Sequence, residues 1–196
     1  MSQLKQTPSQ TVGPFFAYGL CPEQYNFDLK SLFTANAADP GVAGEHIIIT
    51  GTVYDGSGTA VGDAIIETLQ ADASGQYVAS HDDALARGFK GFCRVGTGTE
   101  EGNRFVIRTI KPGPVATGSA PHIDVILHMR GMLMHAFTRL YFEDEPAANE
   151  SDSVLKGVPA ARRRTLIAKQ VAGSGVKQYR FDIHLQGPDE TVFFDC

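Results

Sequence analysis

The fold class is decided by the stretch HIIITGTVYDGSGTAVGDAIIETLQADASG, which spans residues 46–75. Residues 46–54 are mostly β-branched or apolar, a composition typical of a strand. They are followed by the turn Asp-Gly-Ser-Gly at 55–58, a second strand-like run at 64–70 and a second turn at 72–75. Short strands separated by such turns indicate an all-β protein.

The pattern of short strands and turns continues to the end of the chain. Residues 104–110 alternate polar and apolar side chains until the Lys-Pro-Gly-Pro run at 111–114 ends the strand. The further strands that the pattern predicts are residues 122–129, 138–142, 179–186 and 191–194. We therefore expect a β-sandwich domain that covers residues 46–196.

One segment has the pattern of a helix. Residues 160–170 follow Pro159, a residue suited to the start of a helix, and precede Gly173, a residue suited to its end. Residues 143–153 are acidic, small and polar, which is typical of a loop. The predicted fold is thus a sandwich with one short helix.

Residues 1–45 are the least regular part of the chain. Pro8 and Pro14 restrict their own backbone and that of the residue before them, which favours an extended segment. Disordered tails are poor in aromatic residues, yet Phe15 and Phe16 follow directly. We expect an N-terminal arm that packs on its own domain or on a partner chain.

The composition is that of an ordinary globular protein. The chain has 196 residues, 42% of them hydrophobic, and a net charge of −5, so one domain is expected and a basic nucleic-acid-binding face is not. No apolar run approaches the ~20 residues that span a bilayer. Residues 1–6 lack the apolar core of a secretory signal, and the three cysteines, Cys21, Cys93 and Cys196, form no CxxC pair. A reduced, cytoplasmic setting is the expectation.

A longer set of residues carries a family resemblance. In the first two strands and their turns it comprises Gly51, Val53, Asp55, Gly58, Val61, Ala64, Ile66, Gln70, Ala71, Asp72, Gly75 and Tyr77. That set alone is typical of any prealbumin-like sandwich, carboxypeptidase-associated binding domains included. The further matching segments are residues 7–14, 105–114, 121–124, 140–145 and 187–194. Together they resemble the intradiol ring-cleavage dioxygenases over nearly the whole chain, least at 20–45 and 81–103.

The resemblance implies a specific statement about iron. Members of this family bind Fe(III) through two tyrosines and two histidines, and phenolate is a hard anionic donor that suits the ferric ion. The corresponding positions here are Ala84, Val115, His122 and Asp124, of which only His122 is retained. The resemblance therefore implies an α chain with no metal and no catalytic residue of its own. It would form αβ units, within a larger oligomer, with a homologous β chain that binds the Fe(III).

The same resemblance implies how this chain would serve the shared site. Arg130 would place a positive charge beside the substrate, a catechol that carries a ring carboxylate and reacts with O2. Thr11, Gly13, Pro14 and Phe15 would line the wall of the cavity on the β chain. The alternatives are a surface or structural ion pair for Arg130 and simple interface packing for the arm.

Three other interpretations stay open from the residues alone. Because side chains alternate along a strand, His122, Asp124 and His128 share a face, which is a weak metal signal; a hydrogen-bonded His122–Asp124 pair is the preferred alternative. A self-sufficient iron dioxygenase would have to recruit other ligands, such as His81 and Tyr77 together with His122 and Asp124. A non-enzymatic prealbumin-like binding or scaffold module is the third.

Overall fold

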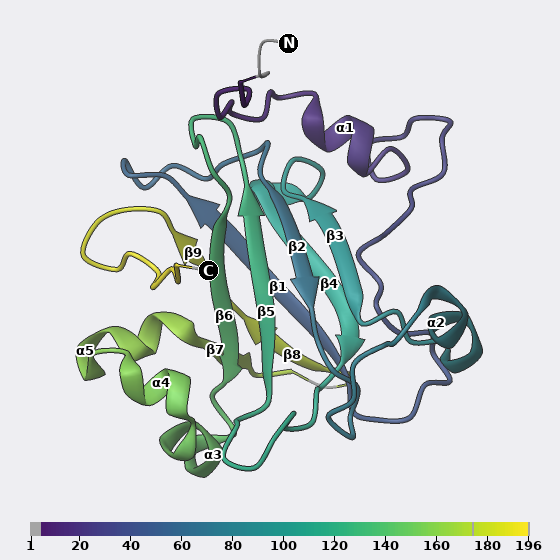
Figure 1. Cartoon of the computed structure of the whole chain (residues 1–196), viewed down its shortest axis with the longest axis vertical. Coiled ribbons are helices and arrows are strands. Elements are labelled where there is room, and N and C mark those ends of the chain that lie inside the picture. The colour runs from purple at the N-terminus through teal and green to yellow at the C-terminus, as the bar shows by residue number, and fades with distance from the viewer. Residues whose placement is uncertain (1–4, 174, 196) are drawn as a thin grey trace.

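The computed structural model describes residues 5–173 and 175–195 of the chain. Nine strands are found in these residues: β1 His46–Tyr54, β2 Ile65–Leu69, β3 Phe92–Gly96, β4 Arg104–Ile110, β5 His122–His128, β6 Ala136–Phe142, β7 Ile167–Val171, β8 Lys177–Arg180 and β9 Ile183–His184. The sheet order is β3-β2-β5-β6-β7-β8-β1-β4, and β9 pairs with β1 (Figure 1). The prediction of a sheet-dominated fold is confirmed.

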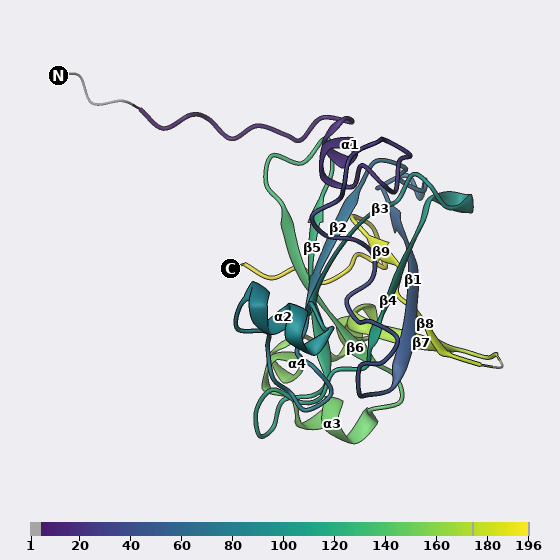
Figure 2. The same cartoon turned by 90° about the vertical axis from the view of Figure 1, so that its right-hand side faces the viewer.

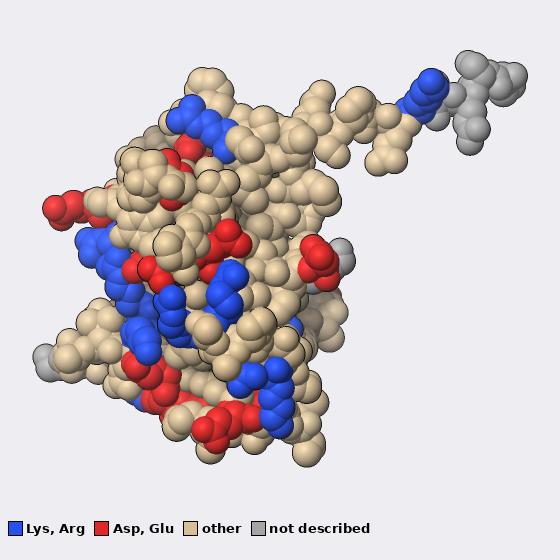
Figure 3. Space-filling view, turned by 90° about the vertical axis from the view of Figure 1, so that its left-hand side faces the viewer, with Lys and Arg blue, Asp and Glu red and all other residues tan. Residues whose placement is uncertain are grey.

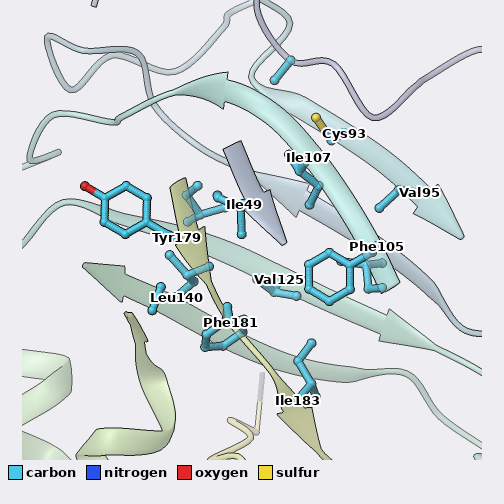
Figure 4. Packing of buried hydrophobic residues seen from close by; sticks show 14 of the residues in the cluster. Ile49, Cys93, Val95, Phe105, Ile107, Val125, Leu140, Tyr179, Phe181 and Ile183 are labelled. Carbon is cyan, nitrogen blue, oxygen red and sulfur yellow. The ribbon is translucent and has the colours of Figure 1, made fainter. Parts of the chain in front are cut away.

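The two ends of this sheet face each other across the core. β2, β3, β5 and β6 lie on one side and β1, β4 and β8 on the other (Figure 2). Between them pack buried side chains from both sides, including Ile49, Phe105, Ile107, Val125, Leu140, Phe181 and Ile183 (Figure 4). Burial of this apolar surface is the main force that holds the two sides together.

β1 and β4 form where the sequence predicts them. They pair antiparallel, with His46 opposite Ile110 and Thr52 opposite Arg104. Gly51 in the middle of β1 allows a close approach, because a Cβ there would overlap the carbonyl oxygen of Phe181 and the ring of Phe105. The absence of a side chain at this one position lets β4 and the segment between β8 and β9 pack closely on β1.

The helix predicted at residues 160–170 is shorter than expected: residues 160–166 are helical, and the last four residues belong to a strand. Only α5, Ala160–Arg163, and a 3-10 turn, Arg164–Leu166, are helical, and β7 begins at Ile167. The reason is pairing on both sides of this segment: Ile167 and Ala168 pair with β6, and residues 169–171 pair with β8. Strand pairing of this kind overrides a local helical preference.

The prediction of a single helix is also wrong. The other helices are α1 Phe16–Leu20, α2 His81–Arg87, α3 Pro146–Ser151, α4 Ser153–Gly157 and the 3-10 turn Glu101–Asn103. α3 lies within residues 143–153, where the sequence predicts a loop, and α4 begins at the last residue of that stretch. Pro146 suits the first turn of α3, and the Asp152 side chain caps α4 by accepting a hydrogen bond from the Leu155 amide at 2.8 Å.

The remaining strand predictions need smaller corrections. β3 was not predicted, and the run 179–186 divides into the end of β8 and the short β9. Residues 191–194 form no strand, only an isolated bridge between Phe194 and Phe137. β3 lacks a clear alternating pattern in the sequence, and its pairing with β2 is what makes it a strand.

The N-terminal segment has two parts. From α1 onward it packs on the domain: Ala17, Cys21 and Ala37 are buried, and the Gln24 amide exchanges two 2.8 Å hydrogen bonds with the backbone of Gly96. Residues 5–11 are exposed and run outward from the domain (Figure 2). Residues 1–4 of the predicted arm and Cys196 lie outside the described residues.

Helices long and apolar enough to cross a membrane are absent from the described residues.

Candidate functional site

One group of polar side chains lies on the β5–β6 ladder. Alternation along β5 places His122 and Asp124 on the same face, and the antiparallel register pairs them with Tyr141 and Arg139 of β6. Directly opposed residues of a ladder project to the same side, so the four side chains form one cluster. The residues between them, Ile123 and Leu140 among them, point into the core.

The cluster is tied together by hydrogen bonds. Arg139 Nε donates to Asp124 Oδ1 at 2.8 Å, and the Tyr141 hydroxyl donates to Asp152 Oδ1 at 3.0 Å. Asp152 also accepts from the backbone amides of Ala120 and Leu155, at 2.9 and 2.8 Å. His122 donates from Nδ1 to the carbonyl oxygen of Ala120 at 2.7 Å, which fixes its neutral tautomer.

Burial and neighbouring charges set the protonation of these groups. Burial raises the pKa of Tyr141 to about 12, so it is a neutral phenol near pH 7. Burial lowers the pKa of His122, and the charge of Arg139 acts in the same direction. Burial opposes ionisation of Asp152 and of Arg139, but hydrogen bonds outweigh it in both: the pKa of Asp152 is lowered and that of Arg139 is raised.

The two positions that the resemblance assigns to tyrosine ligands hold only carbon. Ala84 lies in α2 and lines a cavity of about 350 Å³ together with apolar residues such as Leu69 and Leu85. Val115 is exposed and follows the Pro-Gly-Pro run near the start of the loop between β4 and β5. Tyr77 is the tyrosine of this region that senses the cluster: its pKa is raised by burial and by the charge of Asp124.

The arm and Arg130 meet at the opposite end of β5. Thr11 Oγ1 accepts a hydrogen bond from the Gly131 amide at 2.9 Å, which holds the arm beside the loop that follows β5. In that loop Arg130 Nε lies 2.5 Å from Asp63 Oδ2, yet 65% of the arginine side chain is exposed. The structure thus brings Thr11 and Arg130 together.

The other predicted arm residues are open to solvent in the chain by itself. The Gly13 carbonyl accepts a hydrogen bond from the Phe16 amide at 3.1 Å, where α1 begins, and a Cβ at Gly13 would have no neighbour within 4 Å. Pro14 is exposed, and Phe15 is 76% exposed although its ring contacts Tyr18 edge-on. Exposed apolar side chains continue onto the neighbouring loop, where Leu133 and Met134 are 67% and 70% exposed.

The two regions are far apart. β5 rises by about 3.3 Å per residue, so His122 and His128, at its two ends, are separated by roughly 20 Å. Figure 1 shows β5 running from the α3 side of the molecule to the end that carries α1. Arg130 lies beyond the far end of β5, so its guanidinium is out of reach of His122.

Comparison with known proteins identifies the family of this chain. The chain is 59% identical, over the full length of both proteins, to the protocatechuate 3,4-dioxygenase alpha chain of Burkholderia cepacia. A family model described as dioxygenase matches residues 26–187. The chain belongs to the intradiol ring-cleavage dioxygenase family. It is also 34% identical, over 81% of its length and 72% of the relative, to the protocatechuate 3,4-dioxygenase beta chain of Burkholderia cepacia.

Solved structures agree on the fold of this intradiol dioxygenase family member. The dioxygenase domain of a carbohydrate-binding fusion protein from Streptomyces sp. SirexAA-E matches 96% of this chain and 100% of its own with a TM-score of 0.63. Its sequence is only 22% identical, so this likeness concerns the arrangement of the strands alone.

The family uses Fe(III), and the residues present here do not fit that ion. Ala84 and Val115 offer no donor atom, and the Asp124 carboxylate is already paired with Arg139. Residues 5–173 and 175–195 contain no group of three or more His, Cys, Asp or Glu side chains placed to hold a metal, so His81, His122 and Asp124 form no such group. A ferric site would lack both anionic phenolates.

Two sequence interpretations of β5 need correction. His122 and Asp124 do not bond to each other, because their partners are Ala120 and Arg139. His128 shares their face as predicted, but it lies at the far end of the strand and contacts Glu67 at 3.3 Å, so it is not placed to bind a metal together with them. Both errors come from treating the strand alone, whereas neighbouring strands supply the actual partners.

The sequence-based predictions did not include three members of the polar cluster, Arg139, Tyr141 and Asp152. Arg139 and Tyr141 could have been found from alternation in residues 138–142, which places them opposite in direction to the core residues Leu140 and Phe142. Asp152 carries no local signal for this role, since its partners Tyr141 and Ala120 are distant in sequence.

Proposed function

We propose that the chain is the non-iron-binding α subunit of a protocatechuate 3,4-dioxygenase. The enzyme cleaves protocatechuate with O2 to 3-carboxy-cis,cis-muconate, a step of aromatic catabolism in the β-ketoadipate pathway. The observation that carries the proposal is full-length identity of 59% to an alpha chain, in a sequence that has Ala84 and Val115 where the family's tyrosine ligands would be.

In this proposal the Fe(III) and the ring-cleaving chemistry belong to the β chain. The αβ units assemble into a larger oligomer in the cytoplasm, and this chain binds no metal. A curated beta chain that is 34% identical to this chain supports a pairing of two related two-layer, prealbumin-like sandwiches. Such a pairing across a pseudo-two-fold axis explains why one partner keeps a degenerate copy of the site.

This chain itself contributes part of the wall of the substrate cavity and the positive charge of Arg130. Arg130 and Thr11 meet at the end of β5 that lies about 20 Å from the degenerate site, and Gly13, Pro14 and Phe15 follow Thr11 in the arm. This distance supports a role for these residues at a site on another chain. There the arm would exclude water, and the Arg130 guanidinium would bind the ring carboxylate of protocatechuate and orient the ring.

The surface around the arm suits an interface. Phe15, Leu133 and Met134 are exposed apolar side chains, and Figure 3 shows few charged side chains on the surface beside the arm. Exposed apolar patches of this kind mark sites of protein association.

The test is to produce the chain alone, a β chain alone and both together, and to measure iron content and ring cleavage in each. We expect iron in proportion to the β chain, no iron and no cleavage with this chain alone, and efficient cleavage only by the pair. Stoichiometric iron with tyrosinate-to-iron colour on this chain alone would support the self-sufficient dioxygenase instead. Failure to bind any β chain would support the scaffold module.

A further inference from the structure

The degenerate metal position contains an arginine that no alignment of ligand positions would point to. We propose that the Arg139 guanidinium takes the place of the metal cation in this chain, and that its ion pair with Asp124 keeps metal ions out of the position that the family's ferric ion would occupy. The inference concerns only residues of this chain, so it does not depend on the identity of the enzyme.

The first support is the geometry of the ladder. Asp124 stands at the position of the family's second histidine ligand and pairs directly with Arg139 across the β5–β6 ladder. Nε of the arginine lies 2.8 Å from Oδ1 of the carboxylate, and the two side chains are only 23% and 35% exposed. A guanidinium at this distance competes directly with any cation for the same oxygen.

The second support is that the arginine is enclosed by further groups of the cluster. His122, the one retained ligand residue, pairs with Tyr141, and their ring centroids are 5.8 Å apart. The Tyr141 hydroxyl is anchored on Asp152, which in turn caps α4 and accepts from the Ala120 amide. These contacts connect the two strands to α4. Arg139 lies beside them on the same face of β6, is only 23% exposed and is hydrogen-bonded to Asp124.

The third support is electrostatic. A divalent or trivalent cation bound at His122 would face the guanidinium within the same cluster, and both charges would be poorly hydrated there. For a divalent ion about 6 Å from a guanidinium, at an effective dielectric constant of ~20, Coulomb repulsion alone lowers the affinity by well over 100-fold. Asp124 would have to lose its arginine partner before it could serve a metal.

The test restores one ligand with and without the guanidinium. Co(II) is titrated into the full chain carrying Asp124→His, and into Asp124→His combined with Arg139→Gln, with calorimetry and visible absorption as readouts. We expect the double variant to bind one Co(II) through the two histidines, at least about 100-fold more tightly than Asp124→His alone. Equal affinity of the two variants would overturn the proposal.

Two controls separate the site from general effects. Asp124→His combined with Arg104→Gln changes the net charge equally but at an exposed arginine on β4, and should bind no more tightly than Asp124→His alone. Each variant is checked for native circular dichroism before titration.

A second measurement covers the case in which a histidine variant fails to fold. The measurement is a double-mutant cycle of Asp124→Asn and Arg139→Gln. We expect the double variant to lose less free energy of unfolding than the two single variants lose together. Strict additivity would show that the pair does not act as a unit and would also overturn the proposal.

Discussion

Arg130 has an ion-pair partner, Asp63, but its own side chain remains largely exposed to solvent. The Asp63 side chain, by contrast, is only 19% exposed. Water weakens the pair from the arginine side, and the guanidinium stays accessible to a further carboxylate. A surface ion pair in the isolated chain and a substrate contact in the complex are compatible at this residue.

The Arg130→Ala variant tests this residue in the complex with a β chain. We expect KM for protocatechuate to rise about tenfold, the effect of losing one charge-assisted hydrogen bond of ~1.5 kcal/mol, with little change for catechol, which has no carboxylate. Steady-state kinetics with both substrates provides the measurement. An equal rise for both substrates would rule out the electrostatic role, and Asp63→Asn, which leaves the guanidinium in place, is the matched control.

His122 makes stability depend on pH. Burial lowers its pKa in the folded chain below the ordinary value of about 6.5, so the unfolded chain binds more protons between the two pKa values. The free energy of unfolding should therefore fall as the pH is lowered from 7 toward 5. Asp152 adds a further loss only at lower pH, because its folded pKa is lowered below that of an ordinary carboxyl group and its contribution disappears on protonation.

The His122→Asn variant should show a smaller loss of stability between pH 7 and pH 5 than the unsubstituted chain. Urea unfolding at several pH values measures this slope. The same substitution at His81, which is exposed at the start of α2, is the control and should leave the slope unchanged. An unchanged slope in His122→Asn would contradict the assignment.

At the scale of elements, the arm and the loop after β5 act as a pair. Thr11 bonds to Gly131, while residues 5–11 otherwise remain exposed beside the domain. An exposed extended segment with few internal contacts adds little to the stability of the domain that carries it. This exposed segment is therefore free to make contacts outside the isolated chain.

Deletion of residues 1–14 should separate function from folding. We expect ring cleavage by the αβ complex to fall at least about tenfold, while the thermal midpoint of this chain changes by no more than a few degrees. Thr11→Val removes the hydroxyl that accepts from the Gly131 amide and donates to the carbonyl of Met129 or Val12, and it should cause a smaller loss of activity. Full activity of the truncated complex would refute the wall role of the arm.

At the scale of the whole molecule, stability depends on the close packing of its two sides. Gly51 is the position where β1 approaches both Phe105 and Phe181 too closely for any side chain. Gly51→Ala should lower the free energy of unfolding by about 3 kcal/mol or more, because the overlap involves a backbone oxygen that cannot move alone. The control is Gly157→Ala at the end of α4, where the added Cβ would have open space around it. It should change stability by less than about 1 kcal/mol. Chemical denaturation compares the two, and equal effects would contradict this account.

Residue chemistry and short-range pattern determined a large part of this protein. The alternation and turns of residues 46–75 and 104–114 are local signals, and the sheet-dominated fold follows from them. The missing donors at Ala84 and Val115 are likewise a property of the sequence, because no folding can add an oxygen to an alanine or a valine.

Only the tertiary structure decided which distant residues meet. Pairing on both sides made a strand of residues 167–171 despite their helical surroundings. Cross-strand register placed Arg139 against Asp124, and the path of the arm placed Thr11 against Gly131. These contacts join residues 15 and 120 positions apart, so their energies arise only when the strands and the arm are already in place, which no local pattern encodes.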